Sequence, residues 1–193
     1  MALLVVGLAI FIALHLIRVV AAPWREAQIE RFGMPAWRGV FGLLSIVGIV
    51  LIVSGYGLAR RYPVPVWLPP FGMAHVTALL TAIAFVMVMA ACVPGNHIKR
   101  ALGGQPFLSG VALWAFAHLL ANGTLHAIVL FVSLLAWSLV KLRADRRRER
   151  EAGVVYAQGT LARDVLVIVI GLVAWAIFAF WLHGVLIGVR PLG

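Results

Sequence analysis

The stretch that decides the fold covers residues 107–142 and reads FLSGVALWAFAHLLANGTLHAIVLFVSLLAWSLVKL. It is almost entirely apolar, and its 36 residues exceed the roughly 20 that one helix needs to cross the hydrocarbon of a bilayer. Asn122-Gly123 interrupts it near the middle, and this dipeptide is a turn signal. We therefore predict two antiparallel membrane helices, 107–121 and 124–140, joined by a tight turn.

The composition places the whole chain among membrane proteins. Of its 193 residues, 64% are hydrophobic and 11% are charged, and the mean hydropathy is +1.06. Soluble domains carry about 25% charged residues. Four further segments are long and apolar enough to cross a bilayer: 2–20, 39–59, 74–93 and 164–187. We predict an all-α, polytopic membrane helix bundle of about six transmembrane helices, formed by residues 1–193 as a single domain.

Lysine and arginine are distributed unevenly between the loops. The first, third and fifth loops and the adjoining helix ends carry 13 of them, whereas the opposite side carries only Arg60, Arg61 and Arg190. Because positive charge marks cytoplasmic loops, we predict both termini on the outside. Residues 141–151 mix basic with acidic side chains, which predicts a fifth helix that continues into water and can meet anionic lipid head groups. The net charge of +10 thus indicates orientation, and no nucleic-acid partner is expected.

Two short features limit what the chain can be. No basic residue precedes the first apolar segment, and Pro23 follows the small residues Ala21-Ala22, so we expect a retained helix rather than a cleaved signal peptide. Cys92 is the only cysteine, which excludes an internal disulfide. It ends an apolar run, and we expect it to be a small buried side chain.

Histidines are the titratable groups of note inside the predicted spans. No phosphate-binding loop, zinc-protease, serine-hydrolase or dinucleotide motif is present, and no Asp or Glu lies in the middle of a span, which argues against an ion-coupled carrier. His118 has Trp114 one turn before it and Asn122 one turn after it, on one helix face. Ala115 would leave room there for a flat ring. Either His118 is a ligand, or it forms a hydrogen bond with a neighbouring helix.

Two further candidate sites lie toward the predicted cytoplasmic side. His15 and Arg18 are three residues apart and share a face; Arg18 either reaches the interface or meets an anionic group of a ligand. In Pro94-Gly95-Asn96-His97-Ile98-Lys99, a turn leads into a short helix that Asn96 would cap and Gly103-Gly104 would end. His97 is then either a surface histidine or part of a polar lid. His75, His126 and His183 fall near the outer surface, where an interfacial position is expected.

The segment 11–17, FIALHLI, resembles the segment 114–120, WAFAHLL. The copies lie in the first and fourth predicted spans, three helices apart, so they would run in opposite directions, as in a 3+3 inverted repeat. Helical side chains lean toward their own N-terminus, so His15 and His118 would both aim at the membrane midplane from opposite sides. This arrangement would suit two axial imidazoles on one haem iron, and Arg18 could then meet a haem propionate.

Together, residues 93–99, residues 113–123 and the early His15 with Arg18 make the chain resemble the NnrU family over essentially its whole length. That family is bacterial and is linked to nitrite and nitric oxide reduction. It is similar in turn to the plant 15-cis-ζ-carotene isomerase, a membrane haem b enzyme whose haem-ligating histidines match His15 and His118 here. The plant enzyme has a cysteine where this chain has Ala115 and a histidine where it has Gln105. This chain therefore departs from the plant pattern: it lacks that cysteine for a ligand exchange, and the third histidine is missing.

The resemblance implies haem b as cofactor, with His15 and His118 as metal ligands and with Arg18, Trp114, Asn122 and His97 as the other cofactor-binding candidates. Three functions stay open: a haem-dependent, isomerase-like enzyme or redox protein acting on a lipophilic small molecule, a non-enzymatic accessory factor that contacts denitrification proteins, and a small-solute transporter. The implied location is the bacterial inner membrane, with both termini in the periplasm. The glycine-rich second span permits a homo-oligomer.

Overall fold

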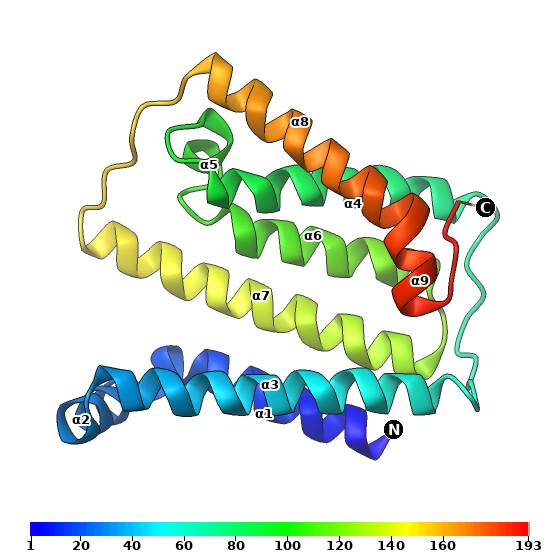
Figure 1. Ribbon diagram of the computed structural model, residues 1–193, viewed down its shortest axis with the longest axis horizontal. Helices are drawn as coiled ribbons and strands as arrows, with labels where there is room; N and C mark the ends of the chain where they lie inside the picture. Colours follow the sequence, from blue (N-terminus) through cyan, green and yellow to red (C-terminus); the bar gives the residue numbers. More distant parts are fainter. Residues whose placement is uncertain (193) are drawn as a thin grey trace. The chain divides into compact units, whose positions relative to one another are not determined.

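A computed structural model describes residues 1–192, and the described chain is all-α (Figure 1). Its elements are α1 (Ala2–Val20), α2 (Ala22–Phe32), α3 (Met34–Ala59), α4 (Met73–Cys92), α5 (His97–Ala101), α6 (Pro106–Ala121), α7 (Leu125–Glu151), α8 (Leu161–Ile177), the π-helix η1 (Phe178–Leu182) and α9 (His183–Ile187). The predicted helical fold is therefore confirmed.

Within residues 1–192, five helical segments are long and apolar enough to cross a membrane: α1, α3, α4, α7, and the continuous run of α8, η1 and α9. The shorter apolar helix α6 has 16 residues. Large apolar side chains such as Leu43, Val53 and Val169 are exposed along these helices, as expected for surfaces that contact lipid rather than water. The chain is thus a multi-pass membrane protein whose spans have a lipid bilayer as their surroundings.

The predicted helix ends agree closely with the structure. Three predictions differ from it, two about helices and one about a side chain. α3 begins at Met34 rather than near residue 39. α2 was not predicted, because residues 22–32 show no apolar periodicity; Pro23 lies in its first turn, a position that suits proline. Cys92 is exposed, so the expectation of a buried thiol was wrong.

The described chain divides into two compact units. The first unit comprises residues 1–67 and 123–133, and the second comprises residues 68–122 and 134–193, of which 193 lies outside the described residues. That residues 1–193 form one domain, and that the helices form a 3+3 inverted arrangement, both stay predictions. Each unit is described by itself below.

In the first unit, α1 and α3 form an antiparallel pair that packs through glycines. A Cβ at Gly7 would come within 2.9 Å of the Gly48 carbonyl oxygen, and a Cβ at Gly55 would collide with the backbone of Leu4. Leu4 is fully buried at this contact. Small residues allow membrane helices to approach closely, and packing and hydrogen bonds replace the hydrophobic driving force that lipid removes. This contact holds α1, which carries His15.

The first unit also contains the turn that precedes α7. The Val66 amide donates to the Gly123 carbonyl at 2.8 Å, and the Leu125 amide donates to the Val64 carbonyl at 2.9 Å. A side chain at Gly123 would collide with the Trp67 carbonyl. The predicted break at Asn122-Gly123 is therefore confirmed, and the requirement for glycine comes from the strand-like segment 64–67 that lies against it.

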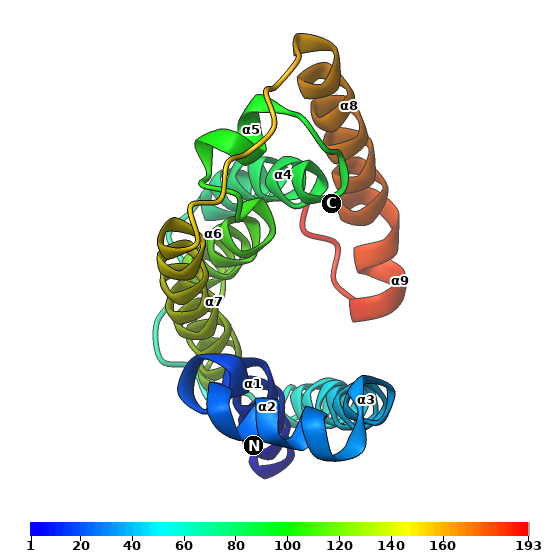
Figure 2. The same ribbon diagram turned by 90° about the vertical axis from the view of Figure 1, so that its left-hand side faces the viewer.

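In the second unit, α4 contacts both α6 and α8 (Figures 1 and 2). A Cβ at Gly110 would meet the Ala84 carbonyl oxygen at 2.8 Å, and a Cβ at Gly171 would meet the Val86 Cα at 2.7 Å. α6 and the part of α7 in this unit run in opposite directions (Figure 1), as predicted. α4 is thus the central helix of this unit, and it positions α6 and α8 on its surface.

The polar end of α7 is fastened to the α5–α6 loop. The Tyr156 hydroxyl donates to the Glu149 carboxylate at 2.6 Å and lies 3.0 Å from the Gly103 carbonyl oxygen. Gln105 Nε2 donates to the other Glu149 oxygen at 2.6 Å. The hydrogen bond to Glu149 is the largest cause of a pKa for Tyr156 of about 12, and burial adds to it. The phenol therefore stays neutral at any physiological pH.

The Tyr156 contact predicts a pH-dependent stability. Because the folded-state pKa is raised, the stabilisation is fully present below the ordinary tyrosine pKa of about 10 and is lost as the pH rises through about 12. We expect Tyr156→Phe to lower the free energy of unfolding by about 1 kcal/mol at pH 8. Thermal unfolding in detergent should show this difference shrinking between pH 10 and pH 12. A difference that is the same at both ends of that range would contradict the assignment.

Candidate functional site

His118 lies near the C-terminal end of α6, in a column of residues spaced one turn apart. Its Nδ1 forms a hydrogen bond with the Trp114 carbonyl at 2.9 Å, and Asn122 Nδ2 donates to the His118 carbonyl at 2.8 Å. The Trp114 and His118 ring centroids are 4.6 Å apart. The shared face predicted for these three residues is confirmed. Ala115, which was expected to leave room for a ring, is fully buried, so its small size serves close packing.

α6 is fixed beside α4 at the level of His118. The Thr77 hydroxyl of α4 donates to the carbonyl of Ala117 at 3.0 Å, the residue before His118. Ala117 itself is fully buried, and Gly110 allows the two helices to touch two turns earlier. These contacts with α4 fix both the position and the rotation of α6, the helix that carries the half-buried His118.

His15 lies in the first unit on α1, in a similar local arrangement. Its Nδ1 forms a hydrogen bond with the carbonyl of Phe11, one turn earlier, at 2.7 Å. The His15 ring stacks on the Phe11 ring with centroids 4.0 Å apart, and the Phe41 ring lies 5.0 Å away. Arg18 lies in the last turn of α1, which is the end expected to face the cytoplasm.

The two histidines share one chemical consequence of these bonds. A ring nitrogen that meets a carbonyl oxygen must carry the proton, so Nδ1 is the donor and Nε2 bears the lone pair. Histidines that bind metals are commonly held in this way, with the other nitrogen donating to a backbone carbonyl. The donor set therefore fits an axial ligand at His15 and at His118. No groups of three or more His, Cys, Asp or Glu that could hold a metal ion occur within residues 1–192.

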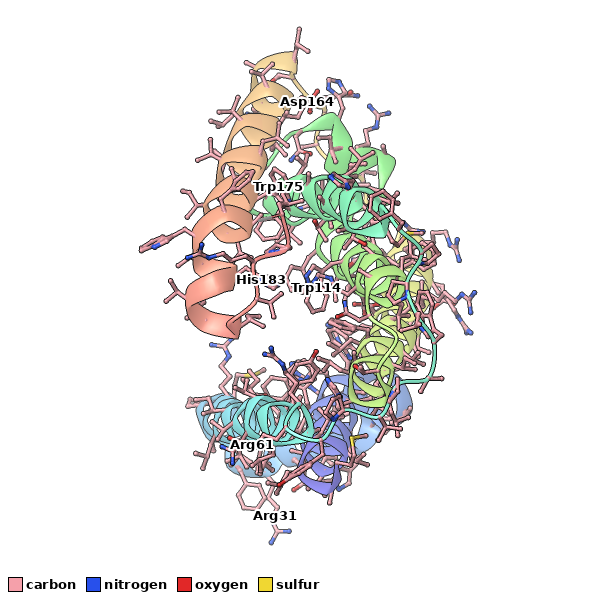
Figure 3. The ribbon with its side chains drawn as sticks, turned by 90° about the vertical axis from the view of Figure 1, so that its right-hand side faces the viewer. Arg31, Arg61, Trp114, Asp164, Trp175 and His183 are labelled. Carbon is pink, nitrogen blue, oxygen red and sulfur yellow. The ribbon has the colours of Figure 1, made fainter. Side chains whose placement is uncertain are left out.

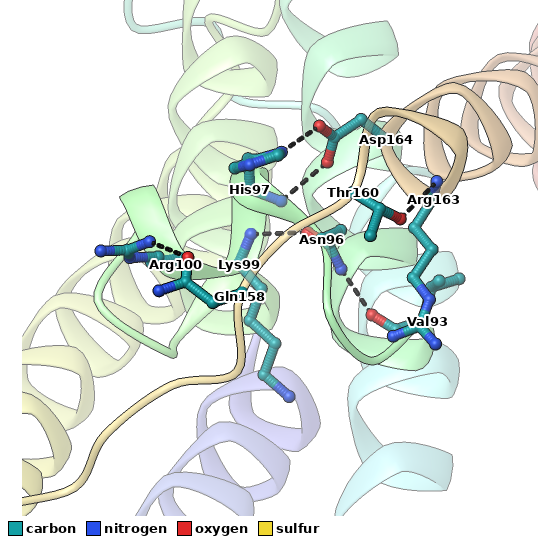
Figure 4. Close-up of polar contacts among 9 residues, drawn as sticks. All are labelled: Val93, Asn96, His97, Lys99, Arg100, Gln158, Thr160, Arg163 and Asp164. Carbon is teal, nitrogen blue, oxygen red and sulfur yellow. Dashed lines mark hydrogen bonds and ion pairs between the residues drawn. The ribbon is translucent and has the colours of Figure 1, made fainter.

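His97 is placed elsewhere, in a polar cluster between α5 and the start of α8 (Figure 4). Asp164 accepts the His97 backbone amide at 2.7 Å and pairs with its Nδ1 at 2.6 Å. The His97 side chain is 55% exposed, whereas that of Asp164 is 15% exposed. Asn96 caps α5 by accepting the Lys99 amide at 2.6 Å, as predicted, and its amide group donates to the carbonyls of Ala90 and Val93.

The same cluster anchors the α7–α8 loop. Arg163 donates to the Pro94 carbonyl at 2.8 Å, and Arg100 donates to Gln158 at 2.7 Å. Thr160 caps α8 by accepting the Arg163 amide. The pairing of His97 with Asp164 was not predicted. One feature of the sequence could have drawn attention to Asp164: it is the only carboxylate in the sixth predicted span, and it lies close to a threonine that can cap the helix.

Removing the Asp164 carboxylate should loosen this loop. Asp164→Ala leaves the His97 backbone amide and ring without the acceptor that joins them to the start of α8. We expect faster tryptic cleavage at Arg150 and Arg163 in the detergent-solubilised protein. Glu151→Ala is the matched control, because the Arg147–Glu151 pair has side chains 76% and 62% exposed and such pairs stabilise little. Equal cleavage rates for the two variants would contradict the anchoring role.

The remaining histidines differ in environment. His75 is exposed, as expected. His126 is only 6% exposed, with the Tyr56 ring 5.0 Å away and the Thr124 hydroxyl 3.2 Å from Nε2, and its interfacial position stays a prediction. His183 is half-buried at the start of α9, directly after the π-helix.

Comparison with known proteins gives one match. The sequence profile of the family described as NnrU protein covers residues 3–191, which includes both units. No curated protein matches the chain, and no solved structure matches it. The similarity to the plant isomerase, and with it the ligand assignment to His15 and His118, therefore stays a prediction. The profile spans nearly the whole chain, and the protein belongs to the NnrU family.

Proposed function

We propose that this membrane protein binds haem b through His118 and His15 as axial ligands and performs an isomerase-like or redox reaction on a lipophilic small molecule. The observation that carries the proposal is the hydrogen bond from Nδ1 of each histidine to the carbonyl one turn before it. In both cases Nδ1 carries the proton, so Nε2 is the nitrogen that bears the lone pair. The same tautomer at both histidines supports the proposed ligand role.

The neighbouring residues would each act in a definite way. Trp114 presents its ring beside His118, and Phe11 and Phe41 present theirs beside His15, so flat apolar surfaces border both imidazoles. Asn122 donates to the His118 carbonyl and is a positioning residue that holds the helix turn. Arg18, one turn after His15, is the cation for an anionic ligand group such as a propionate. His97, which pairs with Asp164 in the polar cluster between α5 and α8, is assigned to the polar lid and not to the metal.

Haem held by His15 and His118 would supply electron transfer or Lewis acidity toward a double bond. The chain's own contribution is to orient the two imidazoles and to exclude water. The hydrophobic spans favour a lipid-soluble substrate. Nitrite suits them poorly, because a buried anion needs several hydrogen-bond donors.

The test is the haem content of the protein purified in mild detergent from haem-replete cells. The pyridine haemochrome assay should give stoichiometric haem b, and the absorption spectrum should show a Soret band with a sharp α band after reduction. A colourless protein that also fails to take up added haemin would overturn the proposal.

We also propose the bacterial inner membrane as the location, with both termini in the periplasm, because basic residues gather in the first, third and fifth loops. Trypsin added to inside-out vesicles should cleave the chain between Arg143 and Arg163. Trypsin added to spheroplasts should leave that segment intact. The reverse pattern would overturn this orientation.

A further inference from the structure

The last span of the second unit contains a π-helix that changes which residues share a face. In a regular α-helix, the residue one turn after Phe178 would be Leu182. Within η1, however, the His183 amide donates to the Phe178 carbonyl, five residues earlier. The extra residue in this turn places His183, rather than Leu182, above Phe178. The rings of Phe178 and His183 are accordingly 5.9 Å apart and nearly perpendicular. Single π-turns of this kind occur frequently at functional sites.

The face that His183 joins is the one that packs on α4. Gly171 lies against Val86. Trp175 Nε1 donates to the Thr81 hydroxyl at 3.1 Å. The Phe178 ring then contacts the Phe85 ring, with centroids 5.8 Å apart. The π-turn thus continues this inward-facing row by one more residue, and that residue is a histidine.

α4 brings His183 and His118 to the same level. Thr81 bonds α8, and Thr77, one turn away on the same face of α4, bonds α6 next to His118. From Trp175, the chain advances about 12 Å to His183 at 1.5 Å per residue, past Thr81 and beyond Thr77, because α4 and α8 are antiparallel. Helical side chains lean toward the N-terminus of their own helix, so the His183 ring lies back toward the level of Thr77. Figure 3 shows Trp114, from the His118 column, and His183 extending toward one another from α6 and α9.

The end of the chain fixes the tautomer of His183. Gly188 adopts a left-handed conformation, φ 73°, which turns the backbone back after α9. The Val189 carbonyl then accepts from His183 Nδ1 at 2.6 Å. As in His118, the proton is therefore on Nδ1, and Nε2 bears the lone pair.

From this geometry we infer that His183 is a reserve axial ligand: it takes the position opposite His118 on the haem iron when His15 is absent or released. The inference rests on the proposed function, since it requires haem at His118. It assigns a role to the π-turn, which keeps a metal-binding imidazole within the second unit. The iron would then stay six-coordinate, with His118 and His183 as its two protein ligands, during any step that frees His15.

The test is the spin state of the ferric protein, measured by electron paramagnetic resonance. His15→Ala should keep its haem and stay low-spin. His15→Ala combined with His183→Gly should become high-spin, and added imidazole should restore the low-spin signal by filling the vacated position. This rescue also shows that the double variant is folded. His15→Ala combined with His75→Ala, at an exposed histidine, is the matched control and should remain low-spin.

Each contrary outcome has a separate meaning. A high-spin signal in His15→Ala alone would overturn the role of His183 and leave haem binding at His118 intact. Loss of haem from His15→Ala would also overturn the role of His183, and haem in the native protein would then still support the proposed function. The same is true if the His15→Ala, His183→Gly protein stays low-spin without imidazole. Absence of haem from the native protein would overturn the proposed function itself, and the reserve ligand with it.

Discussion

Replacing His118 with alanine is expected to remove haem b almost completely from the purified protein. His118 combines a fixed helix position, through the Thr77–Ala117 bond, with a tautomer in which Nε2 bears the lone pair, the nitrogen through which we propose that it binds iron. Loss of an outer-shell partner of a metal ligand typically lowers affinity about 10–100-fold, so loss of the ligand should cost more than this. The measurement is haem per chain by the pyridine haemochrome assay, at equal protein concentration.

Two further variants test whether the loss of haem is specific to His118. His75→Ala changes an exposed histidine of α4 and should retain haem at the native level. Asn122→Ala removes only the bond to the His118 carbonyl and should weaken haem retention less than His118→Ala does. If His118→Ala kept native haem content, or if His75→Ala lost as much, His118 would not be a ligand.

The second large effect concerns the close contact of α1 with α3. A methyl group at Gly55 would collide with the backbone of Leu3 and Leu4, whereas a methyl group at Gly57 meets nothing within 4 Å. Overpacking costs about 1–3 kcal/mol, whereas Gly→Ala in an open helix position gains up to about 1 kcal/mol. We therefore expect Gly55→Ala to lower the midpoint of thermal unfolding and Gly57→Ala to leave it unchanged or raise it.

The pair is a stringent control because both glycines lie in α3, two residues apart. Thermal unfolding in the same detergent, followed by circular dichroism, measures the difference. The same shift for both variants would mean that the glycine-mediated contact does not stabilise the first unit. Gly55→Ala should also disturb the surroundings of His15, since α1 carries that residue.

The sequence was sufficient for features that depend on local chemistry. Asn96 was expected to cap a short helix and does so through the Lys99 amide. The mixed charges of residues 141–151 predicted that the fifth span continues beyond the membrane, and α7 ends at Glu151. Apolar length likewise predicted α1 with its observed bounds.

What the sequence could not show depends on tertiary contacts. The polar residues of α2 follow no apolar period, so only the structure reveals that helix. Nothing in Phe178–Leu182 indicates an extra residue per turn, yet this π-turn sets the face on which His183 lies. The pairing of His97 with Asp164 joins residues 67 positions apart, and a single sequence gives no measure of such proximity.

The most direct test of haem ligation by two histidines is the ferric electron paramagnetic resonance spectrum of the native protein as isolated. Two imidazoles on one iron predict a low-spin spectrum with no substantial high-spin signal. A purely high-spin spectrum would show that only one histidine, or none, binds the iron, and this would contradict the account.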